Sequence, residues 1–297
     1  MMTIELAPNH KTGLALANPV MPAAGCFGFG AEYAHLIEGE TLGAVVVGPV
    51  TAGKRRGANP PRTLPLPSSQ GGTGGVLLHT GLANPGIAAV VRRYARVWDR
   101  SPVPVIVHIA GTSPGETASC CRRLASVEAV SGIELGLAGT GNLDDAIAII
   151  QAAHATASQP LIVRLPLVSA DLLHSLCEAV VEAGADALTI AAPPRGTVWH
   201  ETRFLPLRLH KNLVSVSTRF VTGRLYGPFV HPLTLRALRR VAEFISVPII
   251  GCGGIHSTED ARAFLRAGAT AIQVDGALWR DPSCLTRIAR SLGIVRE

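Results

Sequence analysis

The stretch Pro248-Ile249-Ile250-Gly251-Cys252-Gly253-Gly254-Ile255 joins a short apolar run to a glycine-rich turn, and Ser257-Thr258-Glu259-Asp260 follows closely. Short apolar runs bounded by glycine are typical of buried strands in parallel sheets. A serine followed by acidic residues is typical of a helix N-terminus, where side chains accept bonds from free N–H groups. The segment therefore predicts a strand, a tight turn and a helix, in that order.

The same strand-and-helix unit recurs along the whole chain. Eight short runs rich in Val and Ile are predicted strands: residues 19–24, 44–50, 103–109, 132–137, 161–165, 187–191, 248–250 and 270–274. Amphipathic stretches between them supply the crossover helices that parallel strands need, including residues 114–126, 143–155, 170–183, 233–245 and 258–267. Eight β/α units favour an α/β fold closed as a (β/α)8 TIM barrel over an open sheet, with residues 1–297 as one domain.

Other sequence features predict further parts of this barrel. Gly184 and Gly268 stand where helix C-caps belong, directly before predicted strands. Residues 3–16 are expected to form an N-terminal β-hairpin that covers the bottom of the barrel. Two long insertions, residues 51–85 and 193–232, follow strands two and six and are expected to be irregular. In a barrel they lie at the C-terminal ends of the strands, where sites are built.

Composition excludes several classes of protein. With 297 residues, 47% of them hydrophobic, the chain can bury a sizeable core, and its longest apolar runs, such as 44–50 and 87–91, are too short to cross a bilayer. The start lacks the pattern of a signal peptide, and the six cysteines form no Cys-x-x-Cys pair, so a reducing cytoplasm is expected. The net charge of +6 comes from scattered arginines, and we interpret the single run Lys54-Arg55-Arg56 as a solvated loop rather than a nucleic-acid site.

The glycine-rich turn after residue 250 has a functional and a structural interpretation. In α/β barrels, loops after strands seven and eight commonly hold a phosphate through backbone N–H groups. The alternative is a tight turn that needs a positive φ. A dinucleotide-binding fingerprint is disfavoured because no Gly-x-Gly-x-x-Gly occurs there.

Five motifs, taken in order, resemble one enzyme family. They are Leu-Ala-Asn-Pro-Val-Met-Pro-Ala-Ala-Gly-Cys-Phe-Gly at 16–28, Gly-Leu-Ala-Asn-Pro-Gly at 81–86, Ala-Gly-Ala-Asp at 183–186, Gly-Pro at 227–228, and residues 248–255. Together they resemble the class 1 dihydroorotate dehydrogenases, above all the form that works with an iron–sulfur flavoprotein subunit. The resemblance implies FMN at the strand C-termini and oxidation of dihydroorotate to orotate in pyrimidine biosynthesis. It also implies that flavoprotein subunit as a partner, and we expect a homo-oligomer.

The resemblance also implies site residues. Ala24 and Gly25 would offer backbone contacts to the flavin, and Arg164, in place of a family lysine, would keep a cation near the ring. Close-approach glycines are expected to contribute to the flavin site at Gly223, Gly227, Gly253, Gly254 and Gly276. The substrate would contact Gly81 and Leu82.

Several positions depart from the family pattern. The catalytic cysteine of the strand-four loop falls on Gly139 or an immediate neighbour, and Gly48 replaces a lysine that contacts flavin and substrate. Substrate-facing asparagines correspond to Leu78, Gly136 and Ala192. A hydrogen bond to a charged group contributes about 1.5–3 kcal/mol, so these losses predict altered or weak activity on dihydroorotate or a related small substrate.

Two histidines are candidates for a relocated base. His108 takes the place of a flavin-contacting asparagine, and His79 follows Leu78. Neutral imidazole can act as a base near pH 7, although a structural histidine with a satisfied hydrogen bond is the favoured alternative. Glu134 is interpreted as structural. No metal site is predicted, because His108, Glu134 and Asp275 come from separate strands without a ligand spacing.

The orientation of the Asp275 side chain distinguishes two possible functions of the chain. Asp275-Gly276 stands where the family has the Gly-Thr pair that receives the phosphate, so a carboxylate pointing into that pocket would oppose FMN, unless it faces away or pairs with Arg164. The first function is an FMN-dependent oxidoreductase of the dihydroorotate dehydrogenase type with altered or weak activity. The alternative is a non-catalytic paralogue that serves as a subunit or a ligand-binding protein.

Overall fold

The centre of the molecule is a sheet of eight parallel strands. The computed structural model describes residues 3–32, 41–67, 73–137, 142–204 and 215–293. The strand order is β3 (Val20–Pro22), β14 (Ala271–Val274), β13 (Ile249–Cys252), β10 (Ala187–Ile190), β9 (Leu161–Leu165), β8 (Gly132–Gly136), β7 (Val105–Ala110), β4 (Val45–Val50). The N–H of Gly43, just before β4, donates to the carbonyl of Val20 at an N···O distance of 2.9 Å. The sheet therefore curls into a nearly closed α/β barrel, which confirms the predicted fold class.

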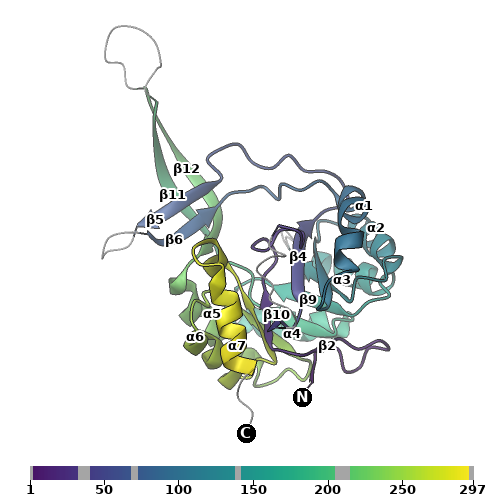
Figure 1. Cartoon of the computed structure of the whole chain (residues 1–297). Helices are drawn as coiled ribbons and strands as arrows, with labels where there is room; N and C mark the ends of the chain where they lie inside the picture. The colour runs from purple at the N-terminus through teal and green to yellow at the C-terminus, as the bar shows by residue number, and fades with distance from the viewer. Residues whose placement is uncertain (1–2, 33–40, 68–72, 138–141, 205–214, 294–297) are drawn as a thin grey trace.

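Helices cover the outside of this barrel (Figure 1). In the described part of the chain they are α1 (Ile87–Trp98), α2 (Pro114–Ala125), α3 (Leu143–His154), α4 (Ala170–Glu182), α5 (His231–Val241), α6 (Thr258–Arg266) and α7 (Ser283–Gly293). The predicted start of α6 is confirmed as a capping box between Ser257 and Asp260. Gly184 follows α4 with a φ of 111°, a conformation that favours glycine at a helix end. None of the described helices is long and apolar enough to cross a membrane.

Side chains that point into the barrel form layers. The lower layer is apolar and takes one or two residues from most strands: Met21, Ala44, Val46, Ile106, Ile162, Ala187, Ile250 and Ala271. The predicted N-terminal hairpin, β1 (Ile4–Glu5) paired with β2 (Ala15–Leu16), packs Leu6, Leu14 and Leu16 against this layer. Figure 1 shows the hairpin strand β2 and the N-terminus at the end of the barrel opposite the long strands β11 and β12. The hairpin closes the bottom of the barrel.

Two residues further along several strands, the same inward face is polar. In a strand, residues i and i+2 point to one side, so His108 follows Ile106, and Arg164 follows Ile162. Thr189 and Gln273 stand in the same relation to Ala187 and Ala271. The barrel core thus changes from apolar to polar toward the C-terminal ends of its strands.

The two long insertions are not irregular, and this part of the prediction was wrong. They pair with each other in a four-stranded antiparallel sheet of order β11 (Arg195–Phe204), β12 (Ser215–Tyr226), β6 (Thr73–Leu78), β5 (Thr63–Pro67). In Figure 1 this sheet projects away from the barrel and from both chain ends. Tyr226 pairs with Val76, so the sheet joins segments about 150 residues apart in sequence.

The sequence hides these strands for physical reasons. β5 reads Thr-Leu-Pro-Leu-Pro, and proline is tolerated there because β5 lies at the sheet edge, where one side needs no donors. β6 contains Gly74 and Gly75, and strand glycines weaken the pattern. Among the described residues, the sheet has a small apolar cluster centred on Leu64, Leu77 and Val221.

Closure of the barrel predicts a sensitive position at Gly43. A Cβ atom there would collide with the backbone carbonyl of Asn18, which cannot move without opening the junction of β3 and β4. Gly43→Ala is expected to lower the free energy of unfolding by about 1–3 kcal/mol, measured by urea denaturation. Gly53→Ala is the matched control, since a Cβ atom there meets nothing within 4 Å. Equal stability of the two variants would contradict this account of closure.

Candidate active site

The carboxylate of Glu134, on β8, lies fully buried at the centre of the polar layer. Its Oε2 is 2.6 Å from Nδ1 of His108 on β7 and 3.6 Å from Nη1 of Arg164 on β9. Its Oε1 accepts hydrogen bonds from Thr189 Oγ1 on β10, at 2.8 Å, and from Gln273 Nε2 on β14, at 2.7 Å. One carboxylate therefore connects five strands of the barrel.

These contacts keep Glu134 ionised and orient His108. Burial acts to raise the pKa of Glu134, but the charge of Arg164 and the hydrogen bonds from His108 and Gln273 outweigh it and lower the pKa to about 2. An ionised carboxylate can only accept, so His108 carries a proton on Nδ1 and donates it to Glu134. In neutral His108 the lone pair is then on Nε2, which is the arrangement of a histidine base held by a carboxylate.

Gly136, the last residue of β8, makes room for this ring. A Cβ atom at residue 136 would lie 2.6 Å from Nε2 of His108, closer than real contacts allow. Both residues line the same cavity. The absence of a side chain at Gly136 leaves Nε2 at the cavity wall.

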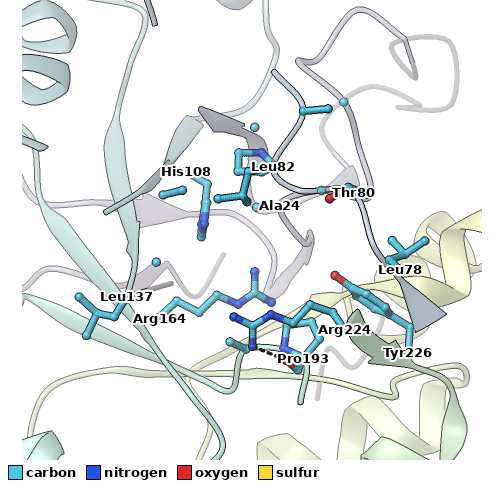
Figure 2. A pocket seen from close by; sticks show the side chains of 18 of the residues that line it. Ala24, Leu78, Thr80, Leu82, His108, Leu137, Arg164, Pro193, Arg224 and Tyr226 are labelled. Atoms are coloured by element: carbon cyan, nitrogen blue, oxygen red, sulfur yellow. Dashed lines mark hydrogen bonds between the residues drawn. The ribbon is translucent and has the colours of Figure 1, made fainter. Parts of the chain in front are cut away.

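The cavity has a volume of about 370 Å³ and lies at the C-terminal ends of the strands. Figure 2 shows His108 and Arg164 pointing into one space, with Arg224 and Tyr226 from β12 along another side. Arg62, Arg164 and Arg224 are among its lining residues, and no Asp or Glu is found among the lining residues that the structure describes. The remaining wall is mostly apolar, with Ala24, Pro49, Leu78, Leu82, Leu137, Ala192 and Pro193. The cavity therefore suits a small anion with a flat apolar body.

Arg164 is held firmly below this space. It is 5% exposed, and its Nη2 donates to the Sγ of Cys252 at 2.6 Å, while Nη1 faces Glu134. Burial is the main cause that raises the pKa of Cys252, to about 12, so this thiol stays protonated. Arg164 therefore provides a fixed positive charge, and Cys252 is a packing partner rather than a nucleophile.

Tyr226 lines both the first cavity and a second one of about 640 Å³. Its ring packs edge to face on Trp279, with ring centres 4.8 Å apart, and burial raises the pKa of its hydroxyl. The second cavity is also lined by His256, Gly276 and Arg280. The sequence did not single out Arg224. The places of Arg224 and Tyr226 here depend on the pairing of β12 with β6, which no local pattern reveals.

The residues predicted to bind flavin, to bind substrate or to act as the base do not all line the same cavity. Ala24, Gly25, Leu82, His108 and Arg164 line the first cavity, and Gly227 and Gly276 line the second. Outside both linings lie Gly81, Gly223, Gly253, Gly254 and His79. His79 instead has its Nδ1 2.7 Å from the carbonyl oxygen of Thr222, so the structure does not bring it to the candidate site. Gly139 lies outside the described residues.

Asp275 follows β14 and is buried, with 1% of its surface exposed. Burial raises the pKa of its carboxyl, and the charge of Arg164 and hydrogen bonds from the backbone N–H groups of Gly276 and Gly254 oppose that rise. The carboxylate therefore takes up the glycine N–H groups expected to hold a phosphate. FMN does not fit these residues at its phosphate end. No group of three His, Cys, Asp or Glu side chains suited to a metal occurs among the described residues.

A cavity at the C-terminal ends of the strands is where α/β-barrel enzymes build their active sites, and here three arginines line it. A family model described as "Dihydroorotate dehydrogenase" matches residues 8–295. The catalytic subunit of dihydroorotate dehydrogenase B (NAD(+)) from Listeria monocytogenes serotype 4b (strain CLIP80459) is 32% identical over 290 residues, covering 94% of this chain and 90% of the relative. The corresponding subunit from Pelobacter propionicus is 33% identical over 301 residues, covering 98% and 92%. The chain belongs to the dihydroorotate dehydrogenase family, a family of oxidoreductases.

The buried network predicts a pH-dependent loss of stability. The pKa of Glu134 is lowered from its ordinary 4.5 to about 2, so its contribution is complete above pH 4.5 and is lost as the pH falls toward 2. Near neutral pH, Glu134→Gln should reduce the free energy of unfolding by about 3 kcal/mol, and the difference from wild type should shrink below pH 4.5. Denaturant titrations across this range test it, with the exposed Glu128→Gln as control. A pH-independent difference would refute the charge-based explanation.

Proposed function

We propose that this chain is a dihydroorotate dehydrogenase-type oxidoreductase with altered or weak activity on dihydroorotate or a related small carboxylate. The observation that carries the proposal is the 2.6 Å contact between His108 Nδ1 and Glu134 Oε2 at the wall of a cationic cavity. It supplies a base where the family motif, as we align it, lacks its cysteine. His108 is therefore the proposed catalytic residue, and Glu134 is a positioning residue.

The chain's own residues support one step, removal of a proton from carbon. A substrate carboxylate would be attracted by Arg164 and Arg224, and the apolar wall would hold its ring. Nε2 of His108 would accept the proton from C5 of dihydroorotate, and the resulting imidazolium would be stabilised by Glu134. Because FMN does not fit at its phosphate end, this step involves the chain's own residues alone.

The expectation of weak turnover is supported by the cavity wall. Gly48, Leu78, Gly136 and Ala192, which by our alignment replace a lysine and three asparagines, all line the cavity, and none has a polar side chain. A substrate that relied on those donors would lose most of its orientation. A Cβ atom at residue 48 would come within 2.8 Å of the His108 carbonyl oxygen, so the local backbone is adapted to glycine.

A non-catalytic ligand-binding paralogue is the second candidate. The observation in its favour is Asp275, whose carboxylate takes the N–H groups of Gly254 and Gly276. Such a protein would keep the barrel and the cationic cavity without turnover. The assay below separates the two candidates.

The proposed partners follow from the family. The curated relatives are named as catalytic subunits, which supports a second subunit, and we propose the iron–sulfur flavoprotein type. Homo-oligomerisation and a cytoplasmic location stay predictions from the sequence.

Two measurements test the proposed function. Steady-state turnover of dihydroorotate with fumarate, NAD or a dye is expected to be slow or absent. Exchange of the C5 protons of dihydroorotate in deuterated water, followed by NMR, is expected to be catalysed, because it needs only the base. His108→Gln should reduce this exchange about 10²–10⁴-fold. His79→Gln is the matched control and should leave it unchanged, since His79 lines neither cavity.

The outcomes distinguish the candidates. Turnover at normal family rates would contradict the proposal of weak activity. Absence of both exchange and turnover in the wild type would favour the second candidate, the non-catalytic paralogue. Equal exchange by His108→Gln and wild type would exclude His108 as the base.

A further inference from the structure

Asp275 places a carboxyl group in a site where the family motif, as we align it, receives a phosphate. It stands between β14 and the short 3₁₀ helix η4 (Gly276–Trp279), at the C-terminal end of a barrel strand. Its side chain is buried, and Oδ1 has no hydrogen-bond partner among the described residues. Buried polar atoms usually have partners, so this carboxylate needs an explanation.

The surroundings of the carboxylate are those of a phosphate cradle. Loops after the last two strands of α/β barrels commonly hold phosphates through backbone N–H groups. Here Gly254, after β13, and Gly276, after β14, direct such groups to Asp275. A Cβ atom at Gly276 would lie 2.9 Å from Cβ of Tyr226, so the loop is packed as closely as glycine allows. The donors that a ligand phosphate would need are already engaged.

The cations near Asp275 do not restore a phosphate site. Arg164 is engaged with Glu134 and Cys252, and no described Lys or Arg side chain lies within ion-pair distance of Asp275. Burial lowers the pKa of His256, which favours its neutral form. Arg280 lines the second cavity but is solvent-exposed, where its charge is screened by water and salt.

The space beside the cradle remains open and is aromatic. The second cavity, about 640 Å³, is lined by Tyr226, Trp279, His256 and backbone glycines, and Tyr226 also lines the first cavity. This lining suits a flat ring and hydroxyl groups, and exposed Arg280 is the one Lys or Arg among the lining residues that the structure describes.

We propose that Asp275 substitutes for a ligand phosphate in the glycine cradle, and that the two cavities lined by Tyr226 select an aromatic ligand without a phosphate, of the riboflavin class, over its phosphorylated form. The proposal concerns binding alone and holds for either candidate function. The test of this proposal measures binding and not turnover. A negative result would therefore not affect the conclusion that the exchange assay gives for His108.

The experiment compares riboflavin with FMN by quenching of flavin fluorescence on titration with the full-length protein. Wild type is expected to bind riboflavin at least tenfold more tightly than FMN. Asp275→Gly, which empties the cradle, should raise FMN affinity tenfold or more and change riboflavin affinity less than threefold. Asp275→Asn keeps the side chain but removes its charge, and should raise FMN affinity threefold or more. Asp281→Asn removes an exposed carboxylate nearby in sequence and should change neither affinity.

Three results would overturn the proposal. One is wild-type protein that binds FMN as tightly as riboflavin or more tightly. Another is the absence of riboflavin binding by the wild type, which would remove the ligand class. The third is folded Asp275→Gly or Asp275→Asn, verified by circular dichroism, with unchanged or weaker FMN binding.

Discussion

One buried carboxylate organises the functional end of this barrel. Glu134 receives bonds or charge from His108, Arg164, Thr189 and Gln273, and each of these side chains comes from a different strand. A buried charge is tolerated only when it is paired and hydrogen-bonded, so the strands must hold their register for the network to exist. The same contacts fix the tautomer of His108 and the position of Arg164. The hydrogen bonds and charge that stabilise the Glu134 carboxylate therefore also determine how His108 and Arg164 are placed in the cavity.

Residues 108 and 136 depend on each other in this arrangement. His108 reaches the cavity wall because Gly136, on the neighbouring strand, has no side chain to obstruct Nε2. Any side chain at residue 136 would displace the ring and strain its bond to Glu134. Substitutions at positions in direct contact are not additive, so the effect of a change at one depends on the residue at the other.

Much of the barrel is predictable from the sequence because parallel buried strands are short apolar runs and the helices have clear caps. Ser257 and Gly184 mark helix ends by local chemistry alone. The antiparallel sheet is not predictable in this way, because proline and glycine interrupt it and its pairing is remote in sequence. For the same reason, the places of Arg224 and Tyr226 in the site cannot be predicted from local sequence patterns. Those of Arg164 and His108 can, because both residues lie at the ends of predicted barrel strands. Gln273 and Thr189 could have been predicted as site residues, since each is a polar residue inside an apolar strand.

The antiparallel sheet also joins parts of the chain that are remote in sequence. Most neighbouring βα units of the barrel meet across short loops, whereas β12 and β6 pair across about 150 residues and β14 and β3 across about 250. Among the described residues, the sheet has a small apolar cluster of its own around Leu77. Since β12 carries Arg224 and Tyr226, one side of the cavity depends on the pairing of this sheet. A ligand that touches both the barrel floor and this sheet would stabilise the closed form by mass action, so that occupancy and local folding are thermodynamically linked.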